Sequence, residues 1–328
     1  MLAKIFAEVI YMDYDITVIG AGVVDVLVGA VDKKILSRNS TPMDFVKVSF
    51  GGDALNEAVV LSRLGKRVQW ISKVGDDTAG RRILSYAEEN GLDVSGVKVQ
   101  EGLETAVNVV LVDHSGERHF LTNPRSSLRR LTETDILPHL EEMAPIVSFA
   151  SMFVSPLLDI PTMAQLFKRI KAGERTLIVD TTHAKNGETP DDLAGLWHYV
   201  DYFMPNESEL ATLTGNDDTY ANIAALMAIG VKCAIVKCGP KGCIVAHGDE
   251  LTKIHAYSVE KVVDTTGAGD CFVAGFLWAL SENIPLVECA RFACSAASCS
   301  VEHVGATTGV QSLAQVMERY RDFRTDAV

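Results

Sequence analysis

The sequence predicts an α/β fold in which helices cover both faces of a doubly wound, mainly parallel sheet, with a small separate β-sheet as a lid. Beyond residue 132, β-rich runs alternate with amphipathic helices, which is typical of a parallel sheet with helical crossovers. A chain of 328 residues that is 48% hydrophobic can build one large core. Residues 105–122 break the alternation and predict the small sheet.

The first elements of the large sheet follow from residue 15 onward. Residues 15–28 are rich in β-branched side chains and are broken by Gly20 and Gly22, so they predict a buried strand followed by a turn. Apolar side chains at helical spacing precede Gly65, which is a typical helix stop. The next expected strands are 42–50 and 67–74, and the expected helices are 53–64 and 78–90.

The expected lid combines two separate segments of the chain. Two β-rich runs flank the polar turn 114–117, which predicts a hairpin within residues 105–122. We expect this hairpin to join strands near residues 35–50 in a small sheet outside the main layers.

The second half of the chain alternates regularly between strands and helices. The expected strands are 146–150, 176–180, 201–204, 233–237, 242–246 and 253–256, and the expected helices are 161–172, 207–214, 219–229, 269–281, 285–300 and 311–323.

Charge and the N-terminus restrict the class of protein. A formal net charge of -13 without a Lys/Arg-rich run argues against nucleic acid or an anionic membrane as partner, because phosphate contacts need concentrated positive charge. No apolar run approaches the length of a membrane span. Glu8 and the lack of a small-residue cleavage site argue against a signal peptide. We expect one folded domain over residues 12–328, with Met12 as an alternative start and residues 1–11 as a flexible or non-native extension.

The cysteine pattern indicates buried thiols in a reducing cytoplasm. Seven cysteines are too few for a disulfide scaffold, and no CxxC pair occurs. Two trios have five-residue steps, which place neighbours on different faces of a helix or strand, so neither trio predicts a metal cluster. The trios are Cys233, Cys238 and Cys243, and Cys289, Cys294 and Cys299.

The strongest chemical signal is the segment 264–278 (DTTGAGDCFVAGFLW), where a polar, glycine-rich stretch enters an apolar helix at about Asp270. Gly267, Ala268 and Gly269 have little or no side chain, so their backbone N–H groups can approach an anion at the positive end of the helix. A carboxylate here is either a simple N-cap or a general base. We favour the base, because phosphoryl transfer to a hydroxyl needs a proton acceptor beside an anion hole.

This segment resembles the C-terminal signature of the ribokinase (PfkB) family of carbohydrate kinases. Residues 51–58 (GGDALNEA), followed by Gly65 and Gly75, resemble the N-terminal signature of the same family. Because both motifs stand in the family's order at opposite ends of the chain, the resemblance covers residues 15–325. It implies a ribokinase-like fold and an ATP-dependent kinase.

The resemblance implies a role for each matching residue on the acceptor side. Asp270 matches the catalytic base, and residues 267–269 match the anion hole. The residues that match the contacts with the sugar hydroxyls are Asp25, Gly51, Gly52 and Asn56.

On the donor side, Asn206 and Glu209 match the family's Asn-x-x-Glu motif, which orders Mg²⁺, its waters and the phosphates of ATP. The structural alternative for this pair is a cap that opens the helix 207–214. Residues 237–242 (KCGPKG) resemble the nucleotide loop, although alone they predict only a hairpin turn. Within this loop the expected ATP contacts are Lys237, Gly239 and Gly242.

Two further motifs remain. Asp264 matches the residue that holds a monovalent cation such as K⁺ in many members of the family, with residues 301–307 supplying carbonyl oxygens. Residues 20–25 (GAGVVD) begin like a dinucleotide fingerprint, but Asp25 stands where the third glycine is required. We therefore reject a nicotinamide site.

The resulting prediction is a kinase that uses ATP and Mg²⁺ to phosphorylate a hydroxyl of a neutral pentose or hexose. A nucleoside kinase of the same family is the first alternative, with Phe120, Phe149 and Phe153 as walls for a base. A non-catalytic sugar or nucleotide sensor is an alternative of another class. Asp53 and Leu55 depart from the small or basic residues that are frequent in the family's sugar motif. An acidic or phosphorylated sugar stays open as acceptor, because polar and basic residues lie at or after the hairpin, namely Arg118, Asn123 and Arg125. The resemblance also implies a homodimer through the lid.

Overall fold

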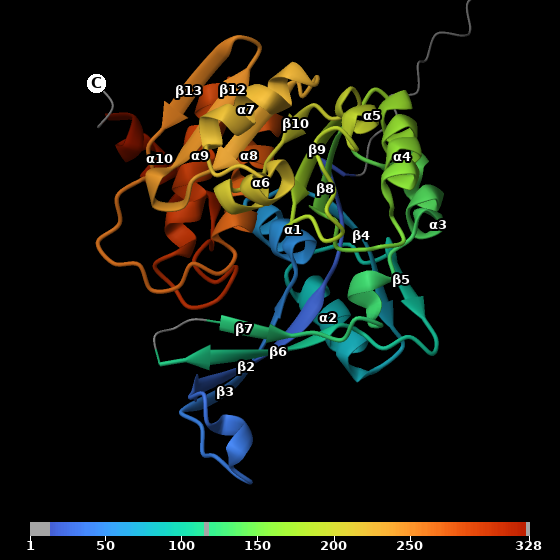
Figure 1. The fold of residues 1–328 in the computed structure, drawn as a ribbon, viewed down its shortest axis with the longest axis vertical. Helices are drawn as coiled ribbons and strands as arrows, with labels where there is room; N and C mark the ends of the chain where they lie inside the picture. Colours follow the sequence, from blue (N-terminus) through green and yellow to red (C-terminus); the bar gives the residue numbers. More distant parts are fainter. Residues whose placement is uncertain (1–13, 115–117, 326–328) are drawn as a thin grey trace, which may run out of the picture.

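The computed structural model describes residues 14–114 and 118–325, which form a large and a small sheet (Figure 1). The expected extension 1–11 and the alternative start at Met12 lie outside the described residues, as do residues 115–117 of the expected hairpin turn. The α/β fold with a mainly parallel sheet and a smaller separate sheet is confirmed.

Within the described residues, nine strands form the large sheet in the order β13-β12-β11-β10-β9-β8-β1-β4-β5. The buried strand β1 (Ile16–Ile19) pairs in parallel with β4 (Val68–Gly75) and β8 (Ile146–Met152). Strand β12 (Cys243–His247) is antiparallel to both neighbours, so the sheet ends in an antiparallel edge. The other strands are β5 (Val97–Gln100), β9 (Thr176–Thr181), β10 (Tyr202–Phe203), β11 (Cys233–Lys237) and β13 (Glu250–Ile254).

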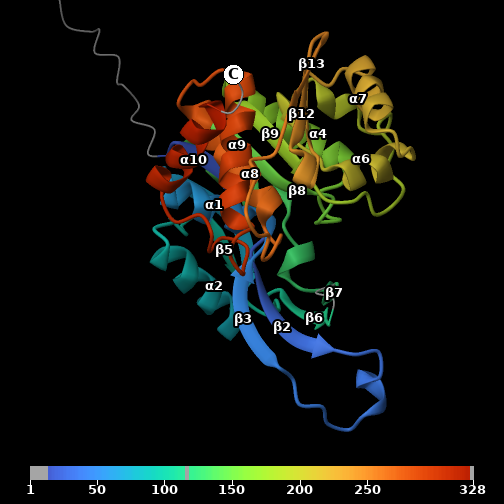
Figure 2. The ribbon, with the colours of Figure 1, turned by 90° about the vertical axis from the view of Figure 1, so that its left-hand side faces the viewer.

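Helices cover both faces of the large sheet, and central strands such as β1 and β4 are therefore buried on both sides. Side chains alternate along β1, so that Ile16 and Val18 pack into one core and Ile19 packs into the other. The first core contains residues of α1 (Asp53–Arg63), α2 (Thr78–Glu89), α8 (Ala268–Ser281), α9 (Leu286–Ser300) and α10 (Leu313–Thr325). The second contains residues of α3 (Glu133–Ile136), α4 (Ile160–Ala172), α5 (Ala194–Trp197), α6 (Glu207–Thr214) and α7 (Thr219–Ala228). Figure 2 shows α8 and α9 on the opposite side of the sheet from α4 and α6.

The small sheet has the strand order β3-β2-β6-β7 and projects from one end of the large sheet (Figures 1 and 2). Strand β2 (Val23–Val31) runs antiparallel to β3 (Phe45–Gly51) and parallel to β6 (Val107–Asp113), which pairs antiparallel with β7 (Arg118–Leu121). The central strand β2 was not expected in the lid, and residues 35–44 contain a short 3-10 turn, Ile35–Ser37, and no strand.

The segment 15–28 therefore contains parts of two strands, where the sequence predicts one strand and a turn. The chain turns between Ile19 and Val23 and leaves the large sheet for the small one. A Cβ at Gly20 would lie 2.9 Å from Cβ of Ala54, so the close packing of α1 on this turn requires glycine.

Several shorter elements were not expected. Strand β5 forms the far edge of the large sheet, and α3 and α5 have four residues each, too few for a helical period to be visible. All seven cysteines are free and buried, which confirms the prediction of buried thiols. Among the described residues, no helix combines the length and the apolar character that crossing a membrane requires.

Candidate active site

Residues 267–269 form the turn at the N-terminus of α8, which we call the anion-binding turn after its predicted role. Gly267 caps the helix with φ 70°, and a Cβ on it would lie 2.5 Å from the carbonyl oxygen of Ala306, so only glycine fits. The backbone N–H groups of Ala268 and Gly269 follow in the first turn, where the helix dipole is positive. The N–H of Ala268 also donates a long hydrogen bond of 3.3 Å to the carbonyl oxygen of Thr265. The role of this turn as an anion hole stays a prediction.

Asp270 lies in the same first turn, facing α1. Its Oδ2 accepts a hydrogen bond of 2.6 Å from Nδ2 of Asn56, a buried residue of α1. Burial raises the pKa of Asp270 well above its usual value, and the negative charge of Asp53 raises it further. A carboxyl group with a raised pKa is a stronger base, which suits proton abstraction near neutral pH.

The other predicted acceptor residues lie close to Asn56. A Cβ at Gly51 would lie 3.3 Å from Oδ2 of Asp25 and 3.6 Å from Oδ1 of Asn56, so glycine leaves room between these two polar side chains. Gly52 has φ 97°, and a Cβ on it would lie 2.6 Å from the carbonyl oxygen of Ala21. The backbone conformation and the close contact therefore both require glycine at this position. Oδ1 of Asp25 accepts a hydrogen bond of 2.9 Å from Asn108 of β6.

Asp270 also lines a cavity of about 880 Å³. Its lining contains all the predicted donor-side residues and none of the predicted acceptor residues. The polar lining near Asp270 is Asp53, Asp180, Asn206, Glu209, Lys237, Gly239, Gly242 and Gly269, and the remainder includes Tyr257, Val259, Val262, Phe272 and Val301. Asp270 therefore connects two groups of residues. Its hydrogen bond to Asn56 joins it to the predicted acceptor residues (Asp25, Gly51, Gly52 and Asn56, called below the acceptor pocket after their predicted role), and it also lines the large cavity.

Asn206 and Glu209 form a capping box at the start of α6. Oδ1 of Asn206 accepts from the backbone N–H of Glu209 at 2.8 Å, and Oε2 of Glu209 accepts from that of Asn206 at 2.7 Å. Capping and cavity lining coexist, because both residues also face the cavity. Burial raises the pKa of Glu209 to about 7, although the nearby Lys237 opposes the shift.

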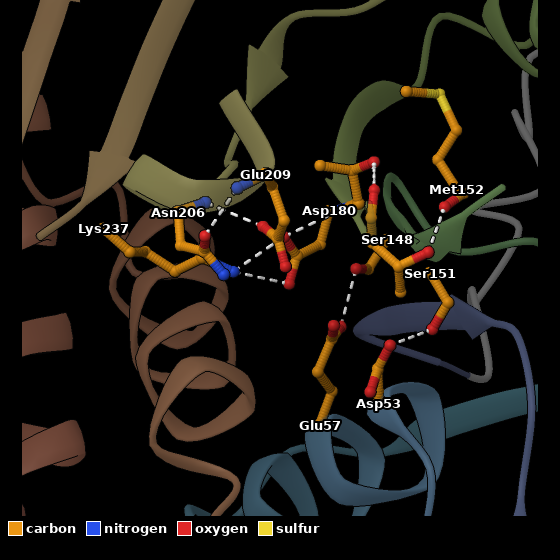
Figure 3. Close-up of polar contacts among 11 residues, drawn as sticks. Asp53, Glu57, Ser148, Ser151, Met152, Asp180, Asn206, Glu209 and Lys237 are labelled. Atoms are coloured by element: carbon orange, nitrogen blue, oxygen red, sulfur yellow. Dashed lines mark hydrogen bonds and ion pairs between the residues drawn. The ribbon is translucent and has the colours of Figure 1, made fainter. Parts of the chain in front are cut away.

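Lys237 forms a buried ion pair that the sequence analysis missed (Figure 3). Its Nζ lies 2.7 and 2.8 Å from the two carboxylate oxygens of Asp180, and a Cβ at Gly269 would lie 3.6 Å from the same Nζ. Burial would lower the pKa of Lys237, but the charges of Asp180 and Glu209 outweigh it and hold the pKa above its usual value. The ammonium is thus a fixed positive charge beside the anion-binding turn. Asp180 ends a predicted parallel strand, a position at which ligand-binding residues of α/β sheets gather, and this signal could have found it.

The two glycines of the nucleotide loop differ in what requires them. Gly239 has φ 54° and no atom within 4 Å of its Cβ position, so it leaves open space beside the cavity. A Cβ at Gly242 would lie 2.0 Å from the carbonyl oxygen of Ile254, so this glycine is required by the packing of neighbouring strands.

Two acidic side chains of α1, Glu57 and Asp53, interact electrostatically with Asp270. Glu57 is fully buried and accepts a hydrogen bond of 2.7 Å from Ser148, and burial together with the charge of Asp180 raises its pKa well above the usual value. Asp53 accepts a hydrogen bond from Ser151, whose φ of 65° is unusual for a residue with a side chain (Figure 3). The sequence showed Asp53 as a departure from the family pattern without placing it beside Asp270.

Asp264 lies at the base of the loop that leads to the anion-binding turn. Its carboxylate accepts hydrogen bonds from the backbone of Thr266 and Gly305 at 2.9 Å each and from Arg118 at 2.7 Å. These donors outweigh burial and lower its pKa. These contacts do not test the expected role of Asp264 in binding K⁺, but they show that Arg118 already supplies a positive charge to the same carboxylate.

The dinucleotide reading of residues 20–25 does not fit the structure. A helix would have to begin after the glycines, but β2 begins at Val23. A Cβ at Gly22 would lie 2.7 Å from the ring of Trp70, so this glycine is required by packing.

The chain is similar to known sugar kinases in sequence and in fold. The family model described as pfkB family carbohydrate kinase matches residues 15–313. Fructokinase-2 from Oryza sativa subsp. japonica is 30% identical over 245 residues, covering 71% of each chain, and ribokinase from Haemophilus influenzae is 26% identical over 277 residues, covering 83% and 87%.

Solved structures show the same fold at lower identity. The Arabidopsis thaliana ribokinase complexed with ribose and ATP has a TM-score of 0.79 at 24% identity, covering 94% of this chain and 99% of its own. An E. coli structure in complex with ATP and Mg²⁺ has a TM-score of 0.78 at 21% identity, with the same coverage. Since the family model spans most of the chain and both halves of the site are formed, the chain belongs to the PfkB family of carbohydrate kinases and is a sugar kinase.

Proposed function

We propose that this enzyme transfers the γ-phosphoryl group of ATP to a hydroxyl of a neutral pentose or hexose, with Asp270 as the catalytic base. The observation that carries the proposal is the position of Asp270, which lines the large cavity and accepts a hydrogen bond of 2.6 Å from Asn56, one of the predicted acceptor residues. A base in this position touches the acceptor hydroxyl while the anion-binding turn receives the phosphoryl group.

Asp270 is well suited to take the acceptor proton. Asn56 donates to Oδ2 and fixes the plane of the carboxylate, so Oδ1 is the atom that we assign to the acceptor hydroxyl. The raised pKa brings the group toward the range in which a base works efficiently near neutral pH.

Positive charge for the transferring phosphoryl group comes from two sources. The N–H groups of residues 268 and 269 and the helix dipole supply partial charge, and Lys237 supplies a full charge next to Gly269. Both are fixed before the substrates arrive, so little reorganisation is needed during the reaction.

The donor-side residues fit magnesium and ATP. Carboxylate and amide oxygens suit Mg²⁺, which retains several waters and binds phosphate oxygens, and Glu209 and Asn206 offer these groups to the cavity. When bound, Mg²⁺ neutralises charge on the β- and γ-phosphates. The apolar lining around Val259 and Val301 is the part of the cavity that we assign to the adenine ring.

The acceptor is proposed from the polar groups around Gly51. Asp25 and Asn56 offer paired polar atoms, which polyols require because an unmatched buried donor or acceptor costs about 1–3 kcal/mol. The fructokinase and ribokinase relatives support a small sugar.

A nucleoside is the second candidate, and one observation favours it. Phe120 of β7 is 55% exposed and, by strand register, shares a sheet face with Asn108, the partner of Asp25. It can therefore wall the acceptor pocket as a stacking surface. Phe149 packs against Phe167 in the core instead. A pure sensor is disfavoured, because Asp270 and the anion-binding turn are complete.

The test is a panel of pentoses, hexoses, sugar acids and nucleosides, with ADP release measured at saturating ATP and Mg²⁺. We expect a neutral sugar to have the highest kcat/KM. A nucleoside that exceeds every sugar by about tenfold, or 1.4 kcal/mol, would replace the sugar proposal by the second candidate. ADP release that no acceptor increases would contradict the kinase reaction itself.

We also propose a homodimer through the lid. Along the small sheet, Val46 and Val48 pair with Val28 and Val26, so that one face carries a continuous row of apolar side chains. Val46 and Val48 are 64% and 62% exposed. An apolar sheet face of this kind fits a second copy packed against it. The location expected from the cysteines, a reducing cytoplasm, stays a prediction.

A further inference from the structure

An ion pair connects the small sheet to the loop before the anion-binding turn. Nη2 of Arg118, the first residue of β7, lies 2.7 Å from Oδ1 of Asp264. Only 23% of the Arg118 side chain and 7% of the Asp264 side chain are exposed. A pair with so little exposure resists screening by salt better than a surface pair does.

Asp264 fixes the shape of the turn that follows it. Its Oδ1 also accepts from the backbone N–H and the hydroxyl of Thr266 at 2.9 and 2.7 Å, and its Oδ2 accepts from the N–H of Gly305 at 2.9 Å. Gly305 precedes Ala306, against which Gly267 packs. The carboxylate thus joins the loop before α8 to the loop after α9, and the anion-binding turn rests between them.

Arg118 also lies near the acceptor pocket. In the register of the small sheet it pairs with Val112, on the same face as Asn108 and Asp25. Its positive charge acts on Asp25, whose negative form it stabilises. One guanidinium group therefore belongs to the lid, faces the acceptor pocket and contacts the base of the anion-binding loop.

We propose that Arg118 is a positioning residue that completes the anion-binding turn through Asp264 only when the lid is closed over the acceptor. This inference rests on the proposed kinase function. The positive charge that the sequence analysis expected from K⁺ at Asp264 is then supplied by Arg118. When the lid opens, the guanidinium of Arg118 moves away and leaves the nearly buried carboxylate of Asp264 without its positive partner, which is unfavourable. The conformations of the turn and of the lid are therefore coupled.

The experiment compares wild type with R118Q, R118K and R125Q, using the best acceptor of the panel. Arg125 is an exposed arginine of the same region and serves as the matched control. Rates are measured in potassium chloride and in tetramethylammonium chloride at equal ionic strength. We expect equal rates for wild type in both salts, since Arg118 already supplies the charge. R118Q should lose kcat on the order of tenfold in tetramethylammonium. R118Q should regain activity in K⁺, which can approach the vacated carboxylate, R118K should retain part of the rate, and R125Q should resemble wild type.

Three results would overturn the inference: wild-type kcat for R118Q in both salts, activation of the wild type by K⁺, or a loss in R118Q that neither K⁺ nor lysine restores. The last would assign Arg118 to the folding of β7. If the wild type phosphorylates no acceptor, the proposed function fails, and amide hydrogen exchange at residues 262–267 then tests the link by itself. R118Q should exchange faster there than R125Q, and equal exchange would contradict the link.

Discussion

Asn56 donates a hydrogen bond of 2.6 Å to Asp270, although the two residues are 214 positions apart in the sequence. The bond joins the N-terminal motif on α1 to the C-terminal motif on α8. Because one motif carries the proposed acceptor contacts and the other the proposed base, this hydrogen bond joins the two halves of the proposed site.

Asp270→Asn should reduce kcat by about 10²–10⁴, because the amide can still accept from Asn56 but cannot take a proton. ATP binding and stability should remain, since the change removes a buried negative charge that Asp53 already disfavours. Steady-state kinetics, ATP titration and thermal denaturation check this, with the exposed Asp217→Asn as control. Turnover above half of wild type would exclude Asp270 as the base.

Gly269→Ala should separate phosphate approach from folding. The new methyl group meets only Nζ of Lys237, at 3.6 Å, and alanine is favoured over glycine in a helix by about 1 kcal/mol, so stability should be kept or increased. Turnover should fall, because the methyl group lies where the phosphoryl group approaches.

Gly275→Ala in the same helix is the matched control for that variant. Its Cβ would lie 2.8 Å from Cβ of Ala296, so it should lower the melting temperature while folded molecules keep their turnover. Normal turnover in Gly269→Ala would show that the turn serves only to start the helix.

Lys237→Met should destabilise the protein by about 3 kcal/mol, because it leaves the carboxylate of Asp180 buried without its ion-pair partner. The double variant Asp180→Asn/Lys237→Met should recover most of this loss but not the affinity for ATP. Denaturant titration and ATP binding check the two parts. Equal stability of the single and double variants would argue against a buried ion pair.

Glu209 should make the apparent affinity for Mg²⁺ depend on pH. With a pKa of about 7, it is mainly ionised at about pH 8 and mainly protonated at about pH 6. The KM for Mg²⁺ should therefore rise as the pH falls through this range, and Glu209→Gln should have a high KM with a flatter profile. The same steep profile in both proteins would assign the titration to another group.

Val48→Lys should produce a monomer, because it places a charge in the exposed apolar row of the small sheet. Lys47→Gln changes the neighbouring residue on the opposite sheet face and should leave the assembly intact. Light scattering coupled to size-exclusion chromatography measures both masses. A wild type that is monomeric at micromolar concentration would contradict the dimer.

Local sequence signals determined most of the framework. The strand and helix alternation predicted the large sheet, since each signal is contained in one short segment. The glycines at 51, 52 and 267 could also be recognised from the sequence, because they stand in the two motifs. In the structure a positive φ at Gly52 and Gly267 and a close contact at Gly51 disfavour a side chain at these positions. The three-residue spacing of Asn206 and Glu209 offered a helix cap as the structural alternative, and the structure contains this capping box.

Only the tertiary structure decided which distant groups meet. Strand β2 belongs to the lid because the chain leaves the large sheet at Gly20. The glycines predicted the turn, but a β-rich run does not record which sheet the strand after the turn joins. Asp180 reaches Lys237, and Arg118 reaches Asp264, through the order of strands and the position of the small sheet. The sequence around a single acidic or basic residue does not show which residue will be its ion-pair partner. Ion pairing depends on distance in space and on burial, and the packing of the whole chain determines both.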